Sequence, residues 1–306
     1  MPTETAADVQ ARLDGLIEST WGFSALAAAA EVGLLGMLDP SCTTGEAALK
    51  TGLTMELATG FLDVLASVGL AHREGERYVA TAGLRQFLAT SQPDDVLAWL
   101  RSAHLQSRDM VEAARRRDLR PGWLHTNPDL LQAQGREGRT SVHAMAAGFA
   151  HVPGLQERLQ RPGATFLDIG MGVGIISIEM CRIYPHLHVV GLEPGVVQAD
   201  EARRNIAAAG FEDRIEVRAQ RLEDLADREA YDTAYLPQVF MPLDVVKAGL
   251  GCVYEALRPG GWITLVAISA PGAELRAVIS RLRNVIWGGA PLSPDDVAGL
   301  TRAAGF

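Results

Sequence analysis

Long apolar runs, cysteines and clustered cations are scarce in this sequence, and each scarcity narrows the class of protein. No apolar run reaches the ~18 residues that a membrane-spanning helix needs, and the polar, acidic start MPTETAADVQ does not resemble a signal peptide. The cysteines are odd in number and widely spaced, which argues against a disulfide framework and a zinc site. We therefore expect a reduced, cytoplasmic protein without a bound metal. The cysteines are Cys42, Cys181 and Cys252.

Positive charge is outweighed by negative charge. The 28 lysines and arginines face 37 acidic residues, giving a net charge of −9, which argues against a nucleic-acid partner. The one dense basic run, Arg115–Arg117, is interpreted as a solvated helix face. Hydrophobic residues make up 48% of the 306 residues, so the chain has enough apolar surface for one large domain or two smaller ones.

The most informative stretch is residues 166–193, FLDIGMGVGIISIEMCRIYPHLHVVGLE. A short apolar run ends at Asp168, three alternating glycines follow, a helix-like segment begins near Val173, and a second apolar run ends at Glu193. The pattern predicts one βαβ unit with an acid at the tip of its second strand. Glycine allows a sharp turn at positive φ and close approach of a ligand. The glycines are Gly170, Gly172 and Gly174.

Two ligand classes suit such a turn. A dinucleotide site has the spacing G-x-G-x-x-G, with the pyrophosphate at the helix N-terminus. Here the spacing is D-x-G-x-G-x-G, and Asp168 would repel a pyrophosphate but suit an ammonium group. Glu193 lies 193 − 168 = 25 residues further on, where it could accept hydrogen bonds from both hydroxyls of a ribose. An amine at one end and a ribose at the other describe S-adenosyl-L-methionine (SAM).

The N-terminal third predicts a winged helix. Residues 9–38 have helical spacing, Thr43 or Thr44 can cap a short helix that ends at Gly52, and a second helix follows from Thr54. AHREGERYVAT predicts two short strands around a turn. Such a module can bind DNA, but the would-be recognition helix, MELATGFLDVLASV, has no lysine or arginine to contact phosphates.

With these two modules in view, the sequence resembles the class I SAM-dependent methyltransferases. The phrases GLAHREGERYVATAGLRQFLA, AAGFEDRIEV and LRPGG are similar to the small-molecule O-methyltransferases related to hydroxyindole and plant phenolic methyltransferases. The resemblance implies an α/β fold, with a Rossmann-like SAM-dependent methyltransferase domain preceded by a mainly α-helical winged-helix dimerisation domain. It also implies a homodimer and a role in secondary metabolism such as antibiotic biosynthesis. The domains expected are residues 1–92, a helical connector at 93–160 that roofs the substrate pocket, and residues 161–306.

The resemblance also assigns the cofactor site residue by residue. Asp168 and the three glycines are expected to hold the methionine end of SAM, and Glu193 the ribose. Gln220 stands where the family usually has an Asp for the adenine amino group, and its amide oxygen can accept the same hydrogen bond. Gln238 is expected at the pocket mouth, bonding to substrate or to the SAM amine, or else capping a strand end. The residues expected to flank the adenine are Gln220, Arg221 and Leu222.

The family's catalytic histidine is missing. Aligned on the fourth strand, the position falls on Met241, whose thioether accepts no proton at neutral pH. In one interpretation the substrate is already a nucleophile, and Met241 only lines the pocket. In another, His143 or His151 of the connector is the base, with Tyr235 or Gln238 orienting the acceptor. In a third, the protein binds SAM without methyl transfer, as a pericyclase-like or binding module, or as a SAM-responsive winged-helix regulator.

The C-terminal segment raises a separate question. In the family, a phrase like AGF leads into two further strands that complete a seven-stranded sheet, whereas the sequence here ends at Phe306. The resemblance therefore predicts a sheet without its last hairpin, which leaves an unpaired edge. Two explanations stay open: a native tail absent from this sequence, or a partner chain that completes the sheet edge.

Overall fold

A computed structural model describes residues 4–306, which divide after Leu105 into two compact units. The division lies inside helix α6 (Pro93–Arg115). No helix of the described residues is both long enough and apolar enough to cross a membrane. Each unit has its own hydrophobic core and is described separately.

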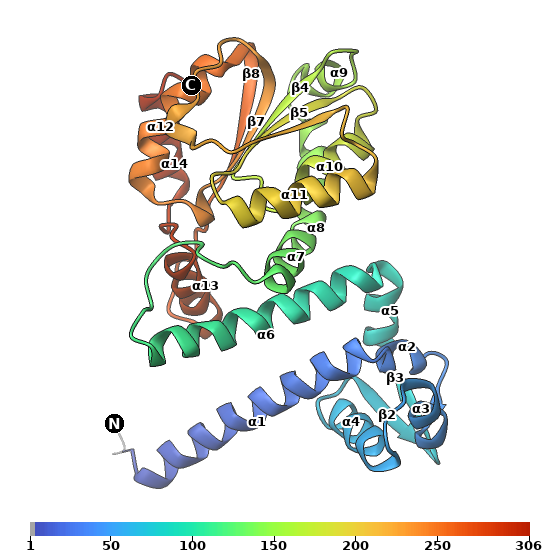
Figure 1. Cartoon of the computed structure of the whole chain (residues 1–306). Helices are drawn as coiled ribbons and strands as arrows, with labels where there is room; N and C mark the ends of the chain where they lie inside the picture. The colour runs from blue at the N-terminus through green and yellow to red at the C-terminus, as the bar shows by residue number, and fades with distance from the viewer. Residues whose placement is uncertain (1–3) are drawn as a thin grey trace. The chain divides into compact units, whose positions relative to one another are not determined.

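The first unit is mainly helical with a small sheet (Figure 1). Its three strands are antiparallel in the order β1-β3-β2, so the predicted hairpin gains a third strand that the sequence did not reveal. Tyr78 on β3 is buried in the core, and its hydroxyl donates a hydrogen bond to Asp63 at 2.5 Å. The elements are α1 (Ala6–Glu31), α2 (Leu34–Met37), β1 (Cys42–Thr43), α3 (Thr44–Thr51), α4 (Met55–Ser67), β2 (Ala71–Glu74), β3 (Arg77–Ala80) and α5 (Ala82–Thr90).

Local sequence signals explain where these helices begin and end. The Thr43 hydroxyl accepts a hydrogen bond from the Glu46 amide, and the Thr43 amide donates one to the Glu46 carboxylate, which forms the capping box that starts α3. Gly52 follows α3 in the left-handed conformation at φ 72°, as a C-terminal glycine should. The Thr54 side chain caps α4 by accepting a hydrogen bond from the Leu57 amide. The predicted helix and hairpin positions in this unit are confirmed.

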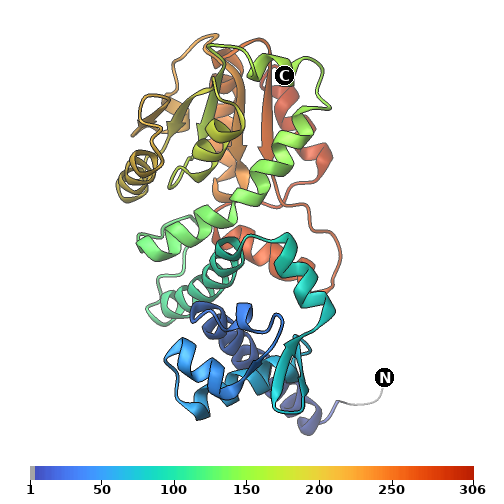
Figure 2. The same ribbon diagram turned by 90° about the vertical axis from the view of Figure 1, so that its right-hand side faces the viewer.

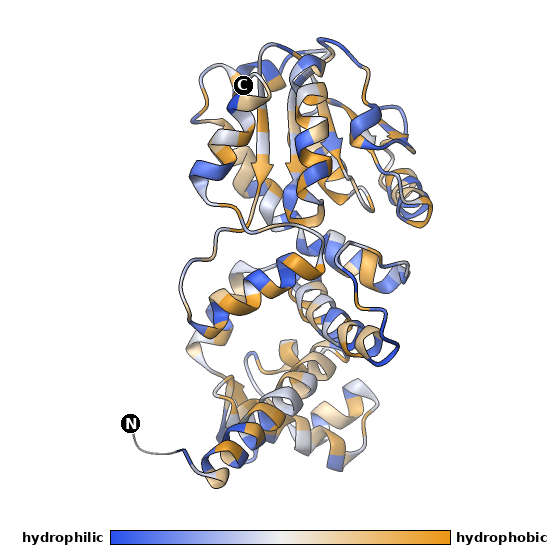
Figure 3. Cartoon of the chain, turned by 90° about the vertical axis from the view of Figure 1, so that its left-hand side faces the viewer, coloured by the Kyte–Doolittle hydropathy of each residue, from blue (hydrophilic) through white to orange (hydrophobic). Residues whose placement is uncertain are grey.

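The second unit is built on a five-stranded parallel sheet in the order β6-β5-β4-β7-β8. Chain order reverses between β4 and β7, and ligands bind at such a switch point in open α/β sheets. In Figure 3 the strands are coloured mainly as hydrophobic, as expected of a sheet covered on both faces. The strands are β4 (Thr165–Ile169), β5 (His188–Leu192), β6 (Ile215–Arg218), β7 (Tyr231–Pro237) and β8 (Leu257–Val266).

Helices cover both faces of this sheet (Figures 1 and 2). Phe166 of β4 belongs to a core shared with α8, α9, α10 and α11, whereas its neighbour Leu167 belongs to the core shared with α12. Successive strand residues therefore point to opposite helical layers. The helices are α7 (Pro128–Glu137), α8 (Arg139–Phe149), α9 (Leu155–Leu159), α10 (Ile175–Ile183), α11 (Val196–Ala209), α12 (Leu243–Ala256), α13 (Leu275–Ile286) and α14 (Pro294–Ala303), with 3-10 turns η1 (Leu222–Asp224) and η2 (Gln238–Phe240).

The predicted fold class is confirmed: a Rossmann-like α/β unit follows a mainly helical unit. One helix was missed. The sequence LRPGWLHTNPD was interpreted as a loop and the helix after it was not predicted, yet α7 starts at Pro128 with Asn127 as its N-cap. Proline at the first helical position is compatible with a helix start because no hydrogen bond is lost there. The domain boundaries at 92 and 160 and the partner strand on the sheet edge stay predictions.

Candidate cofactor and acceptor site

A cavity of about 760 Å³ opens at the carboxyl ends of the strands, and every residue that lines it belongs to the second unit. One part of its wall is the glycine turn after β4 together with the ends of β5 and β6. The other part comes from the loop before α7, from α7 itself, and from the ends of β7 and α13. The volume falls within the ~300–1,000 Å³ typical of small-molecule sites.

The glycine turn has the predicted backbone. Gly170, Gly172 and Gly174 have φ of 66°, 56° and 79°, the left-handed region that glycine adopts without strain. Gly174 immediately precedes α10, so the free N–H groups of that helix point toward the turn. The turn is a backbone cradle at a helix N-terminus.

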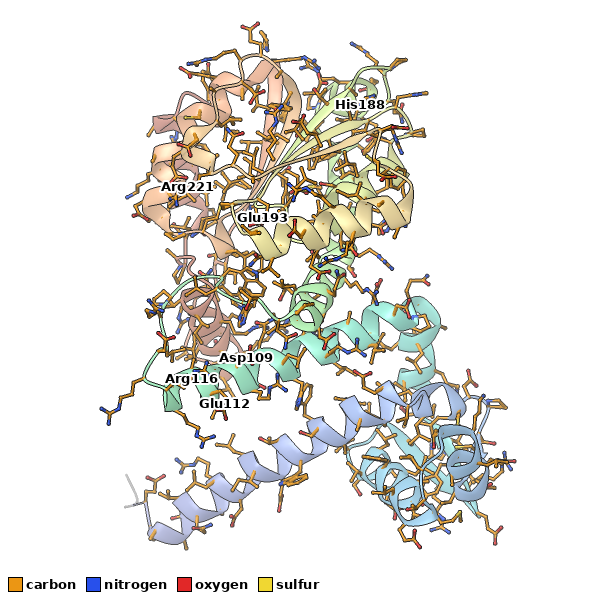
Figure 4. All side chains as sticks on the ribbon, in the orientation of Figure 1. Asp109, Glu112, Arg116, His188, Glu193 and Arg221 are labelled. Atoms are coloured by element: carbon orange, nitrogen blue, oxygen red, sulfur yellow. The ribbon has the colours of Figure 1, made fainter. Side chains whose placement is uncertain are left out.

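Glu193, at the tip of β5, is fixed by two backbone donors. Its Oε2 accepts a hydrogen bond from the Gly172 amide at 2.9 Å, and its Oε1 accepts one from the Gly195 amide at 2.8 Å. Burial raises the pKa of Glu193, and the two amide donors oppose that rise. Figure 4 shows Glu193 and His188 at opposite ends of β5, and Glu193 and Arg221 both line the cavity. Each carboxylate oxygen keeps a lone pair for a ligand hydroxyl.

Asp168 is completely buried and does not line the cavity. The Ser177 hydroxyl donates to Asp168 Oδ2 at 2.6 Å, whereas Oδ1 has no hydrogen-bond partner among the described residues. Burial raises the pKa of Asp168 to about 7, helped by the nearby Glu193 carboxylate and opposed by Ser177. An unpaired, buried carboxylate oxygen at this position would gain from a positive charge placed at the turn.

Three neighbouring residues form the rim beside β6. Gln220 donates its Nε2 to the Asp224 carbonyl at 2.8 Å, which leaves its Oε1 as an acceptor. Arg221 pairs with Glu223 at 2.7 Å. Leu222 is buried and lies in the cavity wall with its two neighbours. An apolar side chain next to a hydrogen-bond acceptor suits a purine ring with an amino group.

The opposite part of the cavity is aromatic. Trp123 from the loop before α7 contacts Phe240 edge-to-face with ring centroids 4.9 Å apart, and Phe240 lies 5.0 Å from Trp287 at the end of α13. Tyr235 of β7 also lines this region, and burial together with the nearby Asp168 raises the pKa of its phenol, so it is a neutral donor. These rings form an apolar wall for a flat ligand.

Met241 connects the two parts of the cavity. A Cβ added at Gly170 would lie 2.5 Å from the Met241 Cε, so the methionine packs directly on the glycine turn. Met241 and Tyr235 both line the cavity, and their assignment to the substrate stays a prediction. No histidine, lysine or cysteine is found among the described residues that line the cavity.

Helix α7, which forms the roof of the cavity, is linked to the glycine turn through Asn205. Asn205 of α11 donates to the Val173 carbonyl at 2.8 Å and also exchanges hydrogen bonds with Gln132 of α7. A Cβ added at Gly135 would lie 2.3 Å from Val173 Cγ2, so α7 rests on the turn through a glycine. The roof helix and the turn therefore have one fixed spacing.

A second chain of hydrogen bonds joins the roof to α13. The Trp287 indole donates to Gln106 Oε1 at 2.7 Å, and Gln106 Nε2 donates to Gln134 Oε1 at 2.7 Å. An indole N–H can only donate, so it fixes the orientation of the Gln106 amide. Trp287 and Gln134 both line the cavity, so this chain spans part of its wall.

Comparisons with known proteins agree with this geometry. Residues 166–261 match the family model described as "Methyltransferase domain". The ubiquinone biosynthesis O-methyltransferase of Xanthomonas euvesicatoria is 29% identical over 125 residues, which cover 40% of this chain and 51% of that protein. The chain thus spans about half the length of the curated relatives it matches first.

Solved structures match over nearly the whole chain. The mitomycin 7-O-methyltransferase MmcR superposes with a TM-score of 0.66 at 21% identity, covering 98% of this chain and 92% of that one. Human N-acetylserotonin methyltransferase, solved in complex with SAM, gives a TM-score of 0.65 at 18% identity, covering 100% and 94%. The chain has the class I methyltransferase fold. The resemblance predicted from the glycine motif is thereby confirmed at the level of fold.

Within this methyltransferase fold, the two candidate bases lie away from the cavity. His143 and His151 are both exposed and neither lines the wall. Both were chosen from a helical segment whose inward face could not be assigned without α7. The structure does not bring them to Tyr235 and Met241, so it offers no support for the interpretation that they act as bases.

Gln238 also lies outside the cavity wall of the methyltransferase fold. Its side chain is completely buried, and neither amide atom has a hydrogen-bond partner among the described residues. Asn284 of α13 is fully buried as well and donates to the neighbouring Val239 carbonyl at 3.1 Å. Gln238, the first residue of η2, is therefore packed in the interior near α13 instead of at the pocket mouth, and its assignment to the cofactor stays a prediction.

Sequence reasoning missed several cavity residues of the methyltransferase fold. Trp123 falls in the segment interpreted only as a broken loop, and Trp287 follows a helix to which no role was given. The signal available was an isolated tryptophan beside Pro-Gly, because a large aromatic side chain in a loop usually packs against something. The cavity residues not predicted include Trp123, Gln134, Glu137, Gln198, Phe240 and Trp287.

Proposed function

We propose that this protein transfers the methyl group of SAM to a small, largely apolar acceptor. The observation that carries the proposal is the continuity of one cavity, which joins the glycine turn and Glu193 to the aromatic wall of Trp123, Phe240 and Trp287. Such a space admits a nucleoside-bearing methyl donor and a second molecule side by side. Proximity and alignment supply most of the acceleration in a displacement of this kind.

The residues present fit SAM. The glycine turn and the unpaired Asp168 Oδ1 suit the amine of the methionine part, Glu193 suits the ribose hydroxyls, and the rim at Gln220–Leu222 suits the adenine. Bound SAM supplies an electrophilic methyl group on a sulfonium. The chain's own part is to hold the acceptor in line and to exclude water from the cavity.

Neither Met241 nor Tyr235, the two side chains expected beside the acceptor, can take up its proton. Met241 occupies the position of the family's histidine, and Tyr235 keeps its proton because burial and Asp168 raise the pKa of its phenol. We infer that the acceptor reaches the cavity as a nucleophile in its own right, such as an ionised oxygen, a neutral amine or an enolate. An acceptor of this type needs positioning rather than deprotonation by the protein.

We also propose a cytoplasmic homodimer that acts in secondary metabolism. The support for a dimer is helix α1, which exposes several large apolar side chains that a second copy could cover. Cys42 and Cys181 are free and buried, as expected in a reducing compartment. The exposed apolar residues of α1 include Leu13, Leu16, Ile17 and Trp21.

The test is turnover with methyl-labelled SAM and small-molecule extracts as the source of acceptor. We expect label in an extractable small molecule, in an amount that depends on enzyme concentration. Loss of the label from SAM without a methylated product, or no loss at all while SAM binds, would contradict methyl transfer. Binding without turnover would instead favour a pericyclase-like or regulatory protein.

A further inference from the structure

The segment Pro121–His125, here called the strap, covers the cavity and is anchored at both ends. At one end the Gly122 amide donates to the Ile286 carbonyl at 3.0 Å, and a Cβ added at Gly288 would lie 2.7 Å from the Gly122 Cα. Four consecutive strap residues, Pro121 to Leu124, line the cavity. A ligand on the aromatic side therefore lies under the strap.

The other end of the strap is held by two side chains. The Gln198 Nε2 donates to the His125 carbonyl at 2.9 Å. The His125 ring lies 3.3 Å from the Asp109 carboxylate through Nδ1 and packs edge-on against Trp123, with centroids 4.7 Å apart. Figure 4 shows Asp109 on α6. Gln198 belongs to α11, the helix that starts just after Glu193, so this anchor reaches the strap from the cofactor side.

The second atom of the same amide lies beside Glu193. A Cβ added at Gly195 would be 2.3 Å from Gln198 Oε1 and 2.9 Å from Glu193 Oε1, so the two oxygens lie close to each other beside Gly195. Both are acceptors, and neither can donate to the other. Two neighbouring acceptors are stabilised when a ligand donor, such as a hydroxyl, bonds to both.

The amide has only two useful orientations. As it stands, Nε2 holds the His125 carbonyl and Oε1 faces the Glu193 carboxylate. Turned over, Nε2 would donate to the carboxylate, and Oε1 would face the His125 carbonyl, where it could form no hydrogen bond. The first orientation holds the strap, and the second releases it. A hydroxyl bound at Glu193 favours the first.

We propose that Gln198 is a positioning residue that couples a ribose hydroxyl at Glu193 to closure of the strap over the acceptor site. The inference rests on the proposed function, because it takes the ribose to be that of SAM. It implies ordered binding, in which the methyl donor binds first and the acceptor site is completed afterwards. Gln198 acts through the strap and does not touch the reacting atoms.

Hydrogen–deuterium exchange of the strap amides tests this coupling without turnover. The full chain is compared alone and with saturating S-adenosyl-homocysteine, adenosine or 2′,3′-dideoxyadenosine. In the wild type, the first two ligands should slow exchange of the strap by roughly two- to twelvefold, the range for one net hydrogen bond. Dideoxyadenosine, which lacks both hydroxyls, should leave strap exchange unchanged.

Two variants and one control isolate the residue. In Gln198→Leu, saturating S-adenosyl-homocysteine should still bind but should no longer slow strap exchange. In Gln198→Glu the ligand should likewise fail to slow strap exchange, because a carboxylate does not donate to the His125 carbonyl. This variant should also bind S-adenosyl-homocysteine more weakly than the wild type, because a second carboxylate lies beside Glu193. The control Arg203→Ala changes an exposed ion pair with Asp200 on the same helix and should keep the wild-type response.

The possible outcomes distinguish a failure of the strap coupling from a failure of the proposed function. If S-adenosyl-homocysteine protects the strap of Gln198→Leu as well as it protects the wild type, the coupling is refuted. If dideoxyadenosine protects the wild-type strap equally, the role of the hydroxyls is refuted. A purely structural role would instead speed exchange in the ligand-free variant while leaving the ligand response intact. Failure of the wild type to bind S-adenosyl-homocysteine would contradict the proposed function itself.

Discussion

Replacing Glu193 by Gln should abolish most of the affinity for the methyl donor while leaving the fold intact. The carboxylate now accepts hydrogen bonds from the Gly172 and Gly195 amides and is proposed to accept two more from ribose hydroxyls. A carboxamide has one oxygen, so its nitrogen must face one of the two amide donors. No orientation of the glutamine satisfies both.

The magnitude follows from the two ribose bonds. A hydrogen bond to a charged group contributes about 1.5–3 kcal/mol, against about 0.5–1.5 kcal/mol for a neutral pair. Neutralising the acceptor of two bonds therefore costs about 2 kcal/mol of binding free energy, which corresponds to a roughly 30-fold higher dissociation constant. The fold should tolerate the change, because burial raises the pKa of Glu193 and a neutral side chain escapes that desolvation cost.

Isothermal titration with S-adenosyl-homocysteine, together with thermal unfolding, measures both quantities. The matched control is Glu216→Gln on the neighbouring strand β6, where the carboxylate is exposed, pairs with Arg218 and lies outside the cavity. That variant should bind within about twofold of the wild type, since exposed pairs contribute little. Binding by Glu193→Gln within threefold of the wild type would refute the ribose assignment and the reasoning behind it.

Three further predictions concern single residues. Burial raises the pKa of Asp168 to about 7 in the folded protein, so the folded state holds a proton that the unfolded state loses near pH 4. The free energy of unfolding should therefore fall as pH rises from about 4 to 7. Asp168→Asn should flatten that slope when unfolding is measured as a function of pH. Gly170→Ala should lower the free energy of unfolding by about 1–2 kcal/mol because of the positive φ at this position, and further because of a clash with Met241 Cε. In chemical unfolding, adding Met241→Ala should restore only the part of the stability that is lost to the clash. Full restoration would contradict the backbone argument. His143→Ala and His151→Ala should keep the methyl-transfer rate within about twofold, because both are exposed and outside the cavity wall, and a tenfold loss would restore one of them as a base.

Local signals were sufficient to predict the fold. Alternating glycines with an acid at each end predicted one βαβ unit, because positive φ and strand-end polarity are properties of short segments, whereas the strand order and the switch point come from the structure. Helix ends were predicted where a cap is visible, as at Thr43 and Gly52. The same kind of signal predicted the N-terminal module, and the resemblance added its relation to methyltransferases.

The cavity wall was harder to predict because it depends on contacts between distant segments. Gln198 bonds to the His125 carbonyl across 73 residues, and Trp287 bonds to Gln106 across 181. Nothing in the local sequence marks such pairs. His143 was chosen for its chemistry, but exposure depends on how α8 packs, and α7, which precedes it, was not predicted.

The central claim is that the acid-flanked glycine turn binds SAM and not a dinucleotide. Equilibrium dialysis of the wild type against labelled SAM and, separately, labelled NAD tests it most directly. The account predicts one SAM bound per chain, displaced by S-adenosyl-homocysteine, and no saturable binding of NAD. Saturable NAD binding without SAM binding would contradict it.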